Sequence, residues 1–192
     1  MHPIHHTEAF VVELIPQGEA NMTVVLFTKE LGIISARAQG VRKPGAKLRA
    51  HLVQYAHVHV DLVRGRGLWR LVNARLLSHV ILATKRAPHA RAFVRVMELI
   101  RRLVPNEGEP LIAIFDHILE CQSLIDEKRI SNKYLDTLML AKTVSLLGYG
   151  SEDTRSRMLL ERSLFDASQL MNDDDNTLLI KNATDALHHS HL

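Results

Sequence analysis

Five short runs of β-forming residues, each closed by a turn signal, fill the first 78 residues and limit what this chain can fold into. The runs are Glu8–Ile15, Met22–Thr28, Ile33–Gln39, Tyr55–Leu62 and Leu68–Leu76. Turn residues such as Pro16-Gln17-Gly18 and Arg64-Gly65-Arg66-Gly67 separate them, and no interval is long enough for the helix of a βαβ crossover. We therefore expect a small closed or nearly closed antiparallel barrel rather than a layered α/β fold.

Two of the runs alternate between apolar and polar residues. In Ile33–Gln39 the polar positions are Ser35, Arg37 and Gln39, and in Tyr55–Leu62 they are Tyr55, His57, His59 and Asp61. Successive side chains of a strand point to opposite faces, so one face of each strand is predicted to be buried in the core and the other exposed to solvent. Phe10 and Phe27 are predicted in the core, which leaves Tyr55 and Trp69 as aromatics that could stack on a ligand.

After His79 the apolar period changes from strand-like to helical. The pattern predicts one helix from Pro88 to about Val104, one from Pro110 to about Ile125, and one capped by Ser131 and ended by Gly148. Two short helices, Arg155–Phe165 and Thr177–Leu187, are expected around a loop at Asn172–Asp175, before a polar tail of six residues. The chain is thus predicted to be α+β, with a barrel in residues 1–78 and a helical domain in residues 79–192.

The charge is divided unevenly along the chain. The formal net charge is only +3, but residues 1–102 hold 16 Lys and Arg against 6 Asp and Glu, and residues 103–192 hold 8 against 15. A concentration of positive charge attracts an anionic polymer, and the acidic half would repel it. The alternative is an accidental scatter of surface charge.

Several classes of function lack their motifs. The chain has no Gly-x-x-x-x-Gly-Lys-Ser/Thr loop, no Gly-x-Gly-x-x-Gly, no Gly-x-Ser-x-Gly and no His-Glu-x-x-His. A nuclease or phosphotransferase that uses clustered acids is disfavoured, because Asp126, Glu127 and Asp173–Asp175 lie away from the basic residues in sequence. The missing motifs predict a non-enzymatic protein without a small-molecule substrate. No apolar run reaches the roughly 18 residues of a membrane span, and the amino end lacks a secretory signal, so a cytoplasmic protein is expected.

Metal binding is also predicted to be absent. Cys121 is the only cysteine, which excludes a cysteine-cluster zinc site. Of the twelve histidines, six are expected in mobile tails: His2, His5, His6, His188, His189 and His191. His57 and His59 share a strand face with Asp61, but no further ligand is evident, and a half-exposed polar face is the favoured interpretation. Asp173–Asp175 are expected to form a solvated acidic turn.

The basic residues of the barrel region fall on elements that could share one surface. Residues 35–75 hold nine cations against one acid, Asp61. Small barrels bind single-stranded nucleic acid across one face between flexible loops, where Lys and Arg meet the phosphates. We therefore predict a DNA-binding surface that is mainly electrostatic and tolerant of sequence. Its candidate residues are Arg37, Arg42, Lys43, Lys47, Arg49, Arg64, Arg66 and Arg70.

Seven stretches in order along residues 8–150 resemble the bacterial recombination mediator family RecO. They are Glu8–Val11, Pro16–Ala20, Leu26–Gly32, Ala38–Lys43, Arg64–Leu71, Glu107–Leu111 with Phe115, and Leu146–Gly150. The resemblance implies an amino-terminal OB-fold followed by a helical domain, in agreement with the barrel and helices predicted above.

The resemblance also implies a function and partners. RecO proteins bind single- and double-stranded DNA, anneal strands coated by single-strand-binding protein, and with RecR help to load the recombinase RecA in DNA repair at the nucleoid. They dock the acidic, Phe-ended tail of single-strand-binding protein on the helical domain, which requires an apolar pocket beside a cation. Arg129, Lys133 and Lys142 are weak candidates for that cation.

The chain departs from this family in two respects. Many members carry a four-cysteine zinc module after the Gly-Tyr-Gly segment, whereas Gly148-Tyr149-Gly150 leads here into Ser151-Glu152-Asp153 without a cysteine. The carboxyl end also looks short for the family. The rival hypothesis is therefore a protein-interaction adaptor that works through its helical domain, with a barrel that does not bind DNA directly.

Overall fold

The structure divides into two compact units. It is a computed structural model that describes residues 3–79, 89–105, 107–108, 110–126, 132–150 and 153–189. The barrel unit comprises Met1–Ala83 with Ile100–Phe115, and the helical unit comprises Thr84–Leu99 with Asp116–Leu192. Each unit draws on two separate segments, so the division at residues 78 and 79 stays a prediction.

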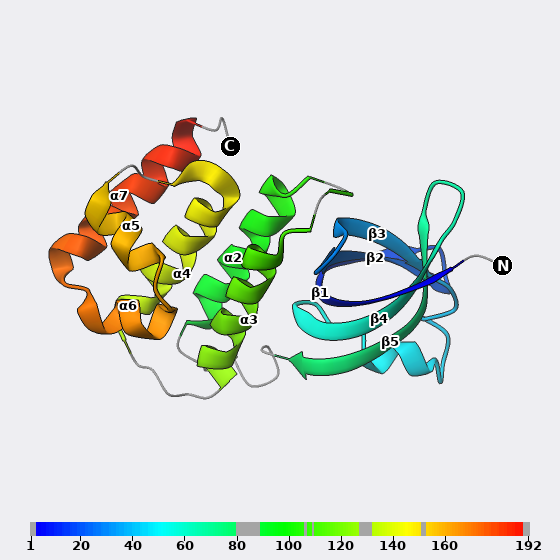
Figure 1. Ribbon diagram of the computed structural model, residues 1–192. Coiled ribbons are helices and arrows are strands. Elements are labelled where there is room, and N and C mark those ends of the chain that lie inside the picture. Colours follow the sequence, from blue (N-terminus) through cyan, green and yellow to red (C-terminus); the bar gives the residue numbers. More distant parts are fainter. Residues whose placement is uncertain are drawn as a thin grey trace. The chain divides into compact units, whose positions relative to one another are not determined.

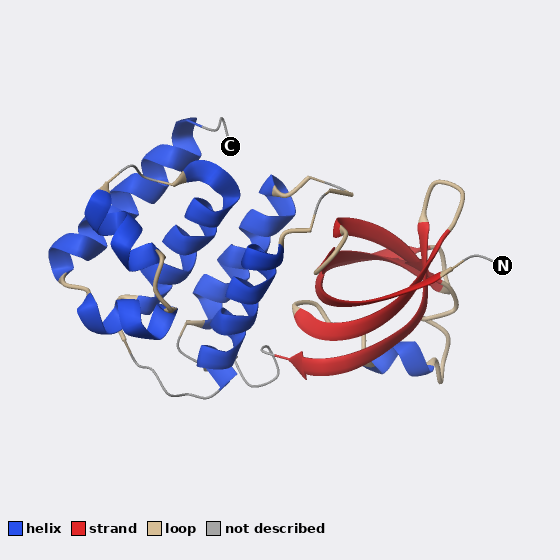
Figure 2. Ribbon diagram, viewed as in Figure 1, coloured by secondary structure: helices blue, strands red, loops and turns tan. Residues whose placement is uncertain are grey.

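Five strands close into a barrel in the first unit (Figures 1 and 2). They are β1 (Ile4–Gln17), β2 (Asn21–Thr28), β3 (Gly32–Ala38), β4 (Ala56–Arg64) and β5 (Trp69–His79), with the short 3₁₀ helix η1 (Lys47–Ala50) between β3 and β4. The order around the barrel is β1-β2-β3-β5-β4, and pairing of β4 with β1 closes it. Neighbours are antiparallel except for β3 and β5, which run parallel. This is the arrangement of an OB-fold, and the α+β prediction is confirmed.

The barrel is filled by the alternating apolar positions that the sequence indicated. Ala56, Val58, Val60 and Leu62 of β4 are all fully buried in its core, and Arg37 of β3 faces water as predicted. Phe10 and Phe27 are buried too, but they are not members of this core cluster. Their rings contact Phe115 at centroid distances of 5.2 and 5.8 Å, so they form a second apolar layer with the segment 100–115.

The first strand is longer than the sequence indicated. β1 begins at Ile4, and its residues Ile4–Phe10 pair with β4. The prediction that His5 and His6 lie in a mobile tail is therefore wrong. Ladder hydrogen bonds to a neighbouring strand order a terminal segment whatever its polarity, and pairing of this kind cannot be read from one strand alone.

Helices form the rest of the described chain. They are α2 (Ala90–Leu103), α3 (Ile112–Asp126), α4 (Leu135–Val144), α5 (Thr154–Leu160), α6 (Leu164–Leu170) and α7 (Asp173–His189), with a π-helical turn η2 (Ser145–Tyr149) after α4. The predicted starts at Pro88 and Ser131 lie outside the described residues. Gly148 has a φ of 91°, which favours glycine and ends the α4–η2 segment as predicted. No helix among the described residues combines the length and apolar character needed to cross a bilayer.

Two predictions near the carboxyl end are wrong. Asp173–Asp175 are the first turn of α7 rather than a solvated loop, and α7 runs to His189 instead of giving way to a tail of six residues. Asn172 explains the early start, because its side chain accepts from the Asp175 N–H at 2.8 Å and its own N–H donates to Asp175 Oδ2 at 3.2 Å. This reciprocal cap, with carboxylates at the positive end of the helix dipole, stabilises the first turn.

Candidate nucleic-acid interface

Two of the candidate cations lie side by side where β3 meets β5. Arg37 of β3 is in register with Arg70 of β5 on one side and with Thr23 of β2 on the other. Both arginines are exposed. Like charges on directly neighbouring strand positions destabilise a sheet. An anion bound between them would remove that repulsion, and the parallel contact that creates the pair was not visible in the sequence.

Four further cations lie in the segment between β3 and β4. Arg42 and Lys43 follow the turn at Gly40, whereas Lys47 and Arg49 belong to η1, and all four are exposed. The segment is anchored to the β1–β2 turn, because the Arg42 N–H donates to the Ala20 carbonyl at 3.0 Å and the Arg42 guanidinium donates to the Gly18 carbonyl. The structure therefore holds Arg42 in a fixed place beside that turn.

The β4–β5 hairpin supplies the remaining candidates, Arg64 and Arg66. Arg64 lies over the ring of Trp69, 4.9 Å from its centroid, and pairs with Glu107 at 2.8 Å. Arg66 is exposed at the tip. Leu68, which was not among the residues predicted for this surface, is 56% exposed in the same hairpin. Exposed apolar side chains in a basic loop can contact bases or sugars, so Leu68 joins the candidate surface.

The aromatic residues do not offer a large stacking platform. Trp69 is only 5% exposed, and its ring meets that of His5 in a T-shaped contact at a centroid distance of 5.1 Å. The prediction that Trp69 could stack on a base is therefore wrong, because it belongs to the barrel core. Tyr55 is half-buried. Cations rather than rings dominate the candidate surface.

The candidate cations are largely uncompensated. Of the eight, only Arg64 forms an ion pair with an acidic residue in the described part of the chain. Arg75, the ninth cation of this region, lies apart from the Arg37–Arg70 pair, since its register partner is His59 of β4. The barrel thus carries positive charge on β3, β5, η1 and two loops that no described carboxylate neutralises. Such a surface attracts phosphates over a Debye length of about 8 Å at physiological salt.

His57 is buried rather than half-exposed, which corrects the prediction for its strand face. Its ring stacks on Phe10 at a centroid distance of 5.0 Å and makes a T-shaped contact with the ring of Phe115 at 5.9 Å. Its Nε2 lies 3.1 Å from Glu8 Oε2. Burial lowers the pKa of His57, and the neighbouring Glu8 carboxylate opposes that shift. The second apolar layer therefore removes this histidine from the ligand-binding candidates.

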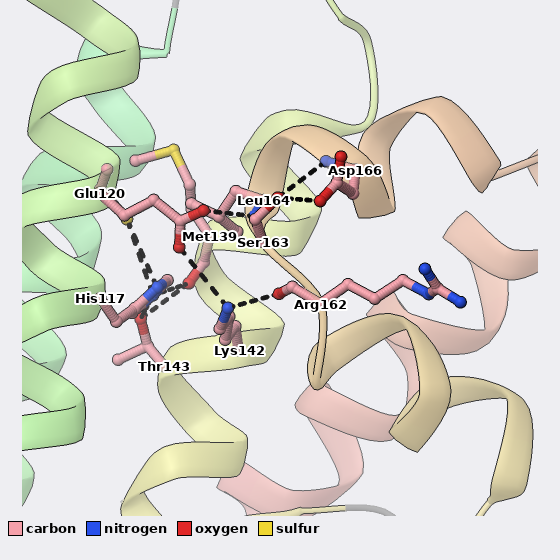
Figure 3. A network of polar contacts seen from close by, with 10 residues as sticks. His117, Glu120, Met139, Lys142, Thr143, Arg162, Ser163, Leu164 and Asp166 are labelled. Atoms are coloured by element: carbon pink, nitrogen blue, oxygen red, sulfur yellow. Dashed lines mark hydrogen bonds and ion pairs between the residues drawn. The ribbon is translucent and has the colours of Figure 1, made fainter.

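The three weak candidates for partner binding differ in their surroundings. Lys133 is exposed and pairs with Asp173 at 2.7 Å, whereas Arg129 lies outside the described residues. Lys142 is turned inward: its Nζ donates to the Arg162 carbonyl at 2.6 Å and lies 3.5 Å from Glu120 Oε2 (Figure 3). Glu120 also accepts from the Leu164 N–H at 2.6 Å, so this network ties α3 and α4 to the loop before α6.

The strand order and the cation distribution define an OB-fold protein with a basic barrel and a separate helical unit. Comparisons with known proteins agree with this class. Residues 1–80 match the family model described as "Recombination protein O N terminal". The barrel of this chain therefore matches the amino-terminal domain of the RecO family.

Its relatives are named as DNA repair proteins. The chain is 25% identical over 150 residues to the DNA repair protein RecO of Frankia casuarinae, covering 77% of this chain and 61% of the relative. It is 29% identical over 138 residues to that of Dehalococcoides mccartyi, covering 70% and 54%. It is 34% identical over 71 residues to that of Bacillus cereus, covering 37% and 29%. The chain thus spans about three fifths or less of the length of these relatives.

Proposed function

We propose that this protein is a non-enzymatic mediator of recombinational DNA repair, which binds single- and double-stranded DNA through its barrel and promotes strand annealing. The observation that carries the proposal is the set of uncompensated cations around the Arg37–Arg70 pair, the η1 segment and the β4–β5 hairpin. The family supports it, because the relatives carry the name DNA repair protein.

Phosphate contacts explain how such a surface would promote annealing. Lys and Arg side chains neutralise the backbone of each strand and reduce the repulsion between two strands held together. Contacts to phosphate carry no sequence information and leave the base edges available for pairing. With Trp69 buried, few rings compete for the bases. The barrel would therefore hold strands without selecting among sequences.

The helical unit would recruit protein partners. The proposed partners are the acidic, Phe-ended tail of single-strand-binding protein and RecR, with RecA loading as the outcome at the nucleoid. Phe165 and Leu170 of α6 are about half exposed, which provides apolar surface for such contacts. Of the two candidates that the structure describes, Lys133 is the exposed cation, although Asp173 already pairs with it.

Fluorescence anisotropy with a labelled single strand, repeated over a series of salt concentrations, tests the proposal. Each neutralised phosphate contributes about −0.7 to the slope of log affinity against log salt on single strands, so engagement of roughly four to six cations gives a slope near −3 to −4. Little dependence on sequence is expected. Absence of binding at low salt would contradict the proposal and favour the adaptor hypothesis.

A further inference from the structure

Three metal-ligating side chains converge on the outer face of the barrel, away from the candidate cations on β3. His59 and Asp61 are two positions apart on β4, so both point outward, opposite to the core residue Val60. His6 of β1 is the register partner of Asp61. This group was not visible in the sequence, where His6 was predicted to lie in a tail, and only the β1–β4 pairing brings His6 to β4.

The three side chains are close enough to share one ion. The His6 Nδ1 atom lies 2.7 Å from Asp61 Oδ1, and the His59 Nε2 atom lies 3.8 Å from the same oxygen. One ligand atom of each residue lies within 4.8 Å of those of the other two. Ligand atoms in a tetrahedral zinc site are about 3.3 Å apart, given metal–ligand distances of about 2.0 to 2.1 Å. Small side-chain rotations are enough to reach that geometry.

The surroundings of Asp61 hold its carboxylate in place. Asn73 of β5, the register partner of Asp61 on the other side, donates from Nδ2 to Asp61 Oδ2 at 3.2 Å. This contact leaves Oδ1 facing the two imidazoles. A hydrogen-bonded partner behind a ligating carboxylate is a recurrent feature of metal sites, and ladder pairing on three strands makes the positions rigid.

We propose that His6, His59 and Asp61 bind a divalent transition-metal ion, Zn²⁺ in particular, with water at the remaining position. Two imidazoles and one carboxylate suit zinc and its neighbours in the first transition row better than Mg²⁺ or Ca²⁺, which prefer oxygen ligands alone. The side chains are 62%, 37% and 21% exposed, respectively, so an ion and its water can enter from solvent. The ion would fasten the start of β1 to β4.

Neighbouring charges set the strength of the site. Glu8 is the register partner of His59 on β1, and Arg75 is its partner on β5. Glu8 contacts His57 and so stays outside the ligand set, but its charge favours a cation nearby. Arg75 opposes one. Replacement of Arg75 by Gln is therefore expected to tighten metal binding.

Calorimetric titration of the full chain with Zn²⁺ at neutral pH, with Co²⁺ as a spectroscopic probe, tests the site. The test variants are His59→Ala and Asp61→Asn, and Asn73→Ala tests the supporting contact. The matched control removes the histidines near the two ends together: His2→Ala, His188→Ala, His189→Ala and His191→Ala. Far-UV circular dichroism checks that every variant is folded.

We expect one tight Zn²⁺ and a visible Co²⁺ absorption band in the wild type and the control, with both lost in His59→Ala and Asp61→Asn. Asn73→Ala should bind about tenfold more weakly. Zn²⁺ should raise the melting temperature of the wild type but not of His59→Ala, because an ion that binds only the folded state stabilises it. Absence of Zn²⁺ binding in the wild type, or binding that only the control loses, would overturn the proposal.

Discussion

The two units of this protein use their positive charges differently. In the helical unit, Lys142 reaches Glu120 and the Arg162 carbonyl, and Arg155 forms two hydrogen bonds to the carboxylate of Asp175 at 2.8 and 2.7 Å. These cations join one helix or loop to another. In the barrel, Arg37 and Arg70 are neighbours in register, and neither forms an ion pair with a described residue.

The difference indicates which charges stabilise the fold and which remain available for a ligand. A cation held by a carboxylate is neutralised and contributes to packing, whereas a cation left among other cations weakens the folded state through repulsion. A surface that retains such repulsion is a candidate for anion binding. We therefore expect removal of cations from the barrel to lower DNA affinity, and removal of a paired cation from the helical unit to lower stability and leave DNA affinity unchanged.

The largest expected effect comes from reversing three cations of the barrel. In the triple variant Arg42→Glu, Lys43→Glu, Lys47→Glu, loss of three phosphate contacts lowers affinity for a single strand by about a hundredfold at about 0.1 M salt and makes the salt slope shallower by about 2. Anisotropy over a salt series measures both. The matched control, Arg157→Glu, Arg162→Glu, Lys181→Glu, carries the same change of net charge on exposed residues of the helical unit. An equal loss of DNA affinity in both variants would contradict the assignment of DNA binding to the barrel.

A smaller effect concerns acid stability and the buried His117 of α3. Burial lowers the pKa of His117 to about 4, and its Nε2 lies 3.1 Å from the Met139 carbonyl and 3.0 Å from Thr143 Oγ1. The unfolded state binds a proton near pH 6.5 and the folded state does not, so stability falls as the pH drops from 6.5 towards 4. From pH 7 to 5 this loss is about 2 kcal/mol.

Urea unfolding of the wild type and of His117→Gln at pH 7 and pH 5 measures that contribution. Glutamine does not titrate, so the advantage of the wild type over the variant should shrink by about 2 kcal/mol at the lower pH. Burial lowers the pKa of His57 in the barrel unit as well. The wild type and His117→Gln both contain His57, so its contribution to the pH dependence of stability cancels in the comparison. Parallel profiles for the two proteins would exclude His117 as the titrating group.

The two units differ in how their positive charges are paired, but the energetic cost of a strained backbone should be the same in both. Gly67 in the β4–β5 hairpin and Gly148 in η2 have φ values of 90° and 91°, and a Cβ at either position would meet no atom within 4 Å. Replacement of each by Ala should destabilise its unit by about 1 kcal/mol through the left-handed backbone alone. Thermal unfolding measures this, with Gly108→Ala as the control without a positive φ. If Gly108→Ala destabilised the protein as much as the other two substitutions, the left-handed backbone would not be the cause.

The smallest effect is expected at the Arg155–Asp175 pair, because Arg155 is 40% exposed and water screens the interaction. Arg155→Met should lower the midpoint of urea unfolding and leave DNA affinity unchanged. The Arg155 hydrogen bonds lower the pKa of Asp175 below its usual 3.8, so the pair contributes at neutral pH and its contribution is lost as the pH falls through the lowered pKa. Arg157→Met, which removes an exposed cation, is the control. A weaker DNA complex in Arg155→Met would contradict the division of roles.

Local patterns in the sequence predicted most of the secondary structure. The alternation in β3 and β4 identified the inward residues, and the positive φ of Gly148 agrees with its predicted place at a helix end. Side-chain period and turn chemistry are local properties, so one strand or helix is enough to reveal them. The same patterns failed at Asn172–Asp175, where a reciprocal cap turned an expected loop into the start of α7.

The candidate site was predicted in composition but not in arrangement. All eight cations were visible in the sequence, yet their partners were not: Arg64 pairs with Glu107, 43 positions away, and Trp69 lies in the core. His6 could not be assigned to a cluster because its neighbours His59 and Asp61 are more than 50 residues distant. Contacts of this range depend on which strands pair.

The sequence by itself determined the strand-rich basic half, the helical acidic half and the inward faces, because these follow from the order and period of residue types. Only the tertiary structure decided that Arg37 meets Arg70, that Lys142 is turned inward, and that His6 joins β4. Barrel closure and helix packing bring together residues that no local pattern connects. The chemistry of a surface depends on those neighbours, since charge is neutralised or left available by what lies within a few ångströms of it.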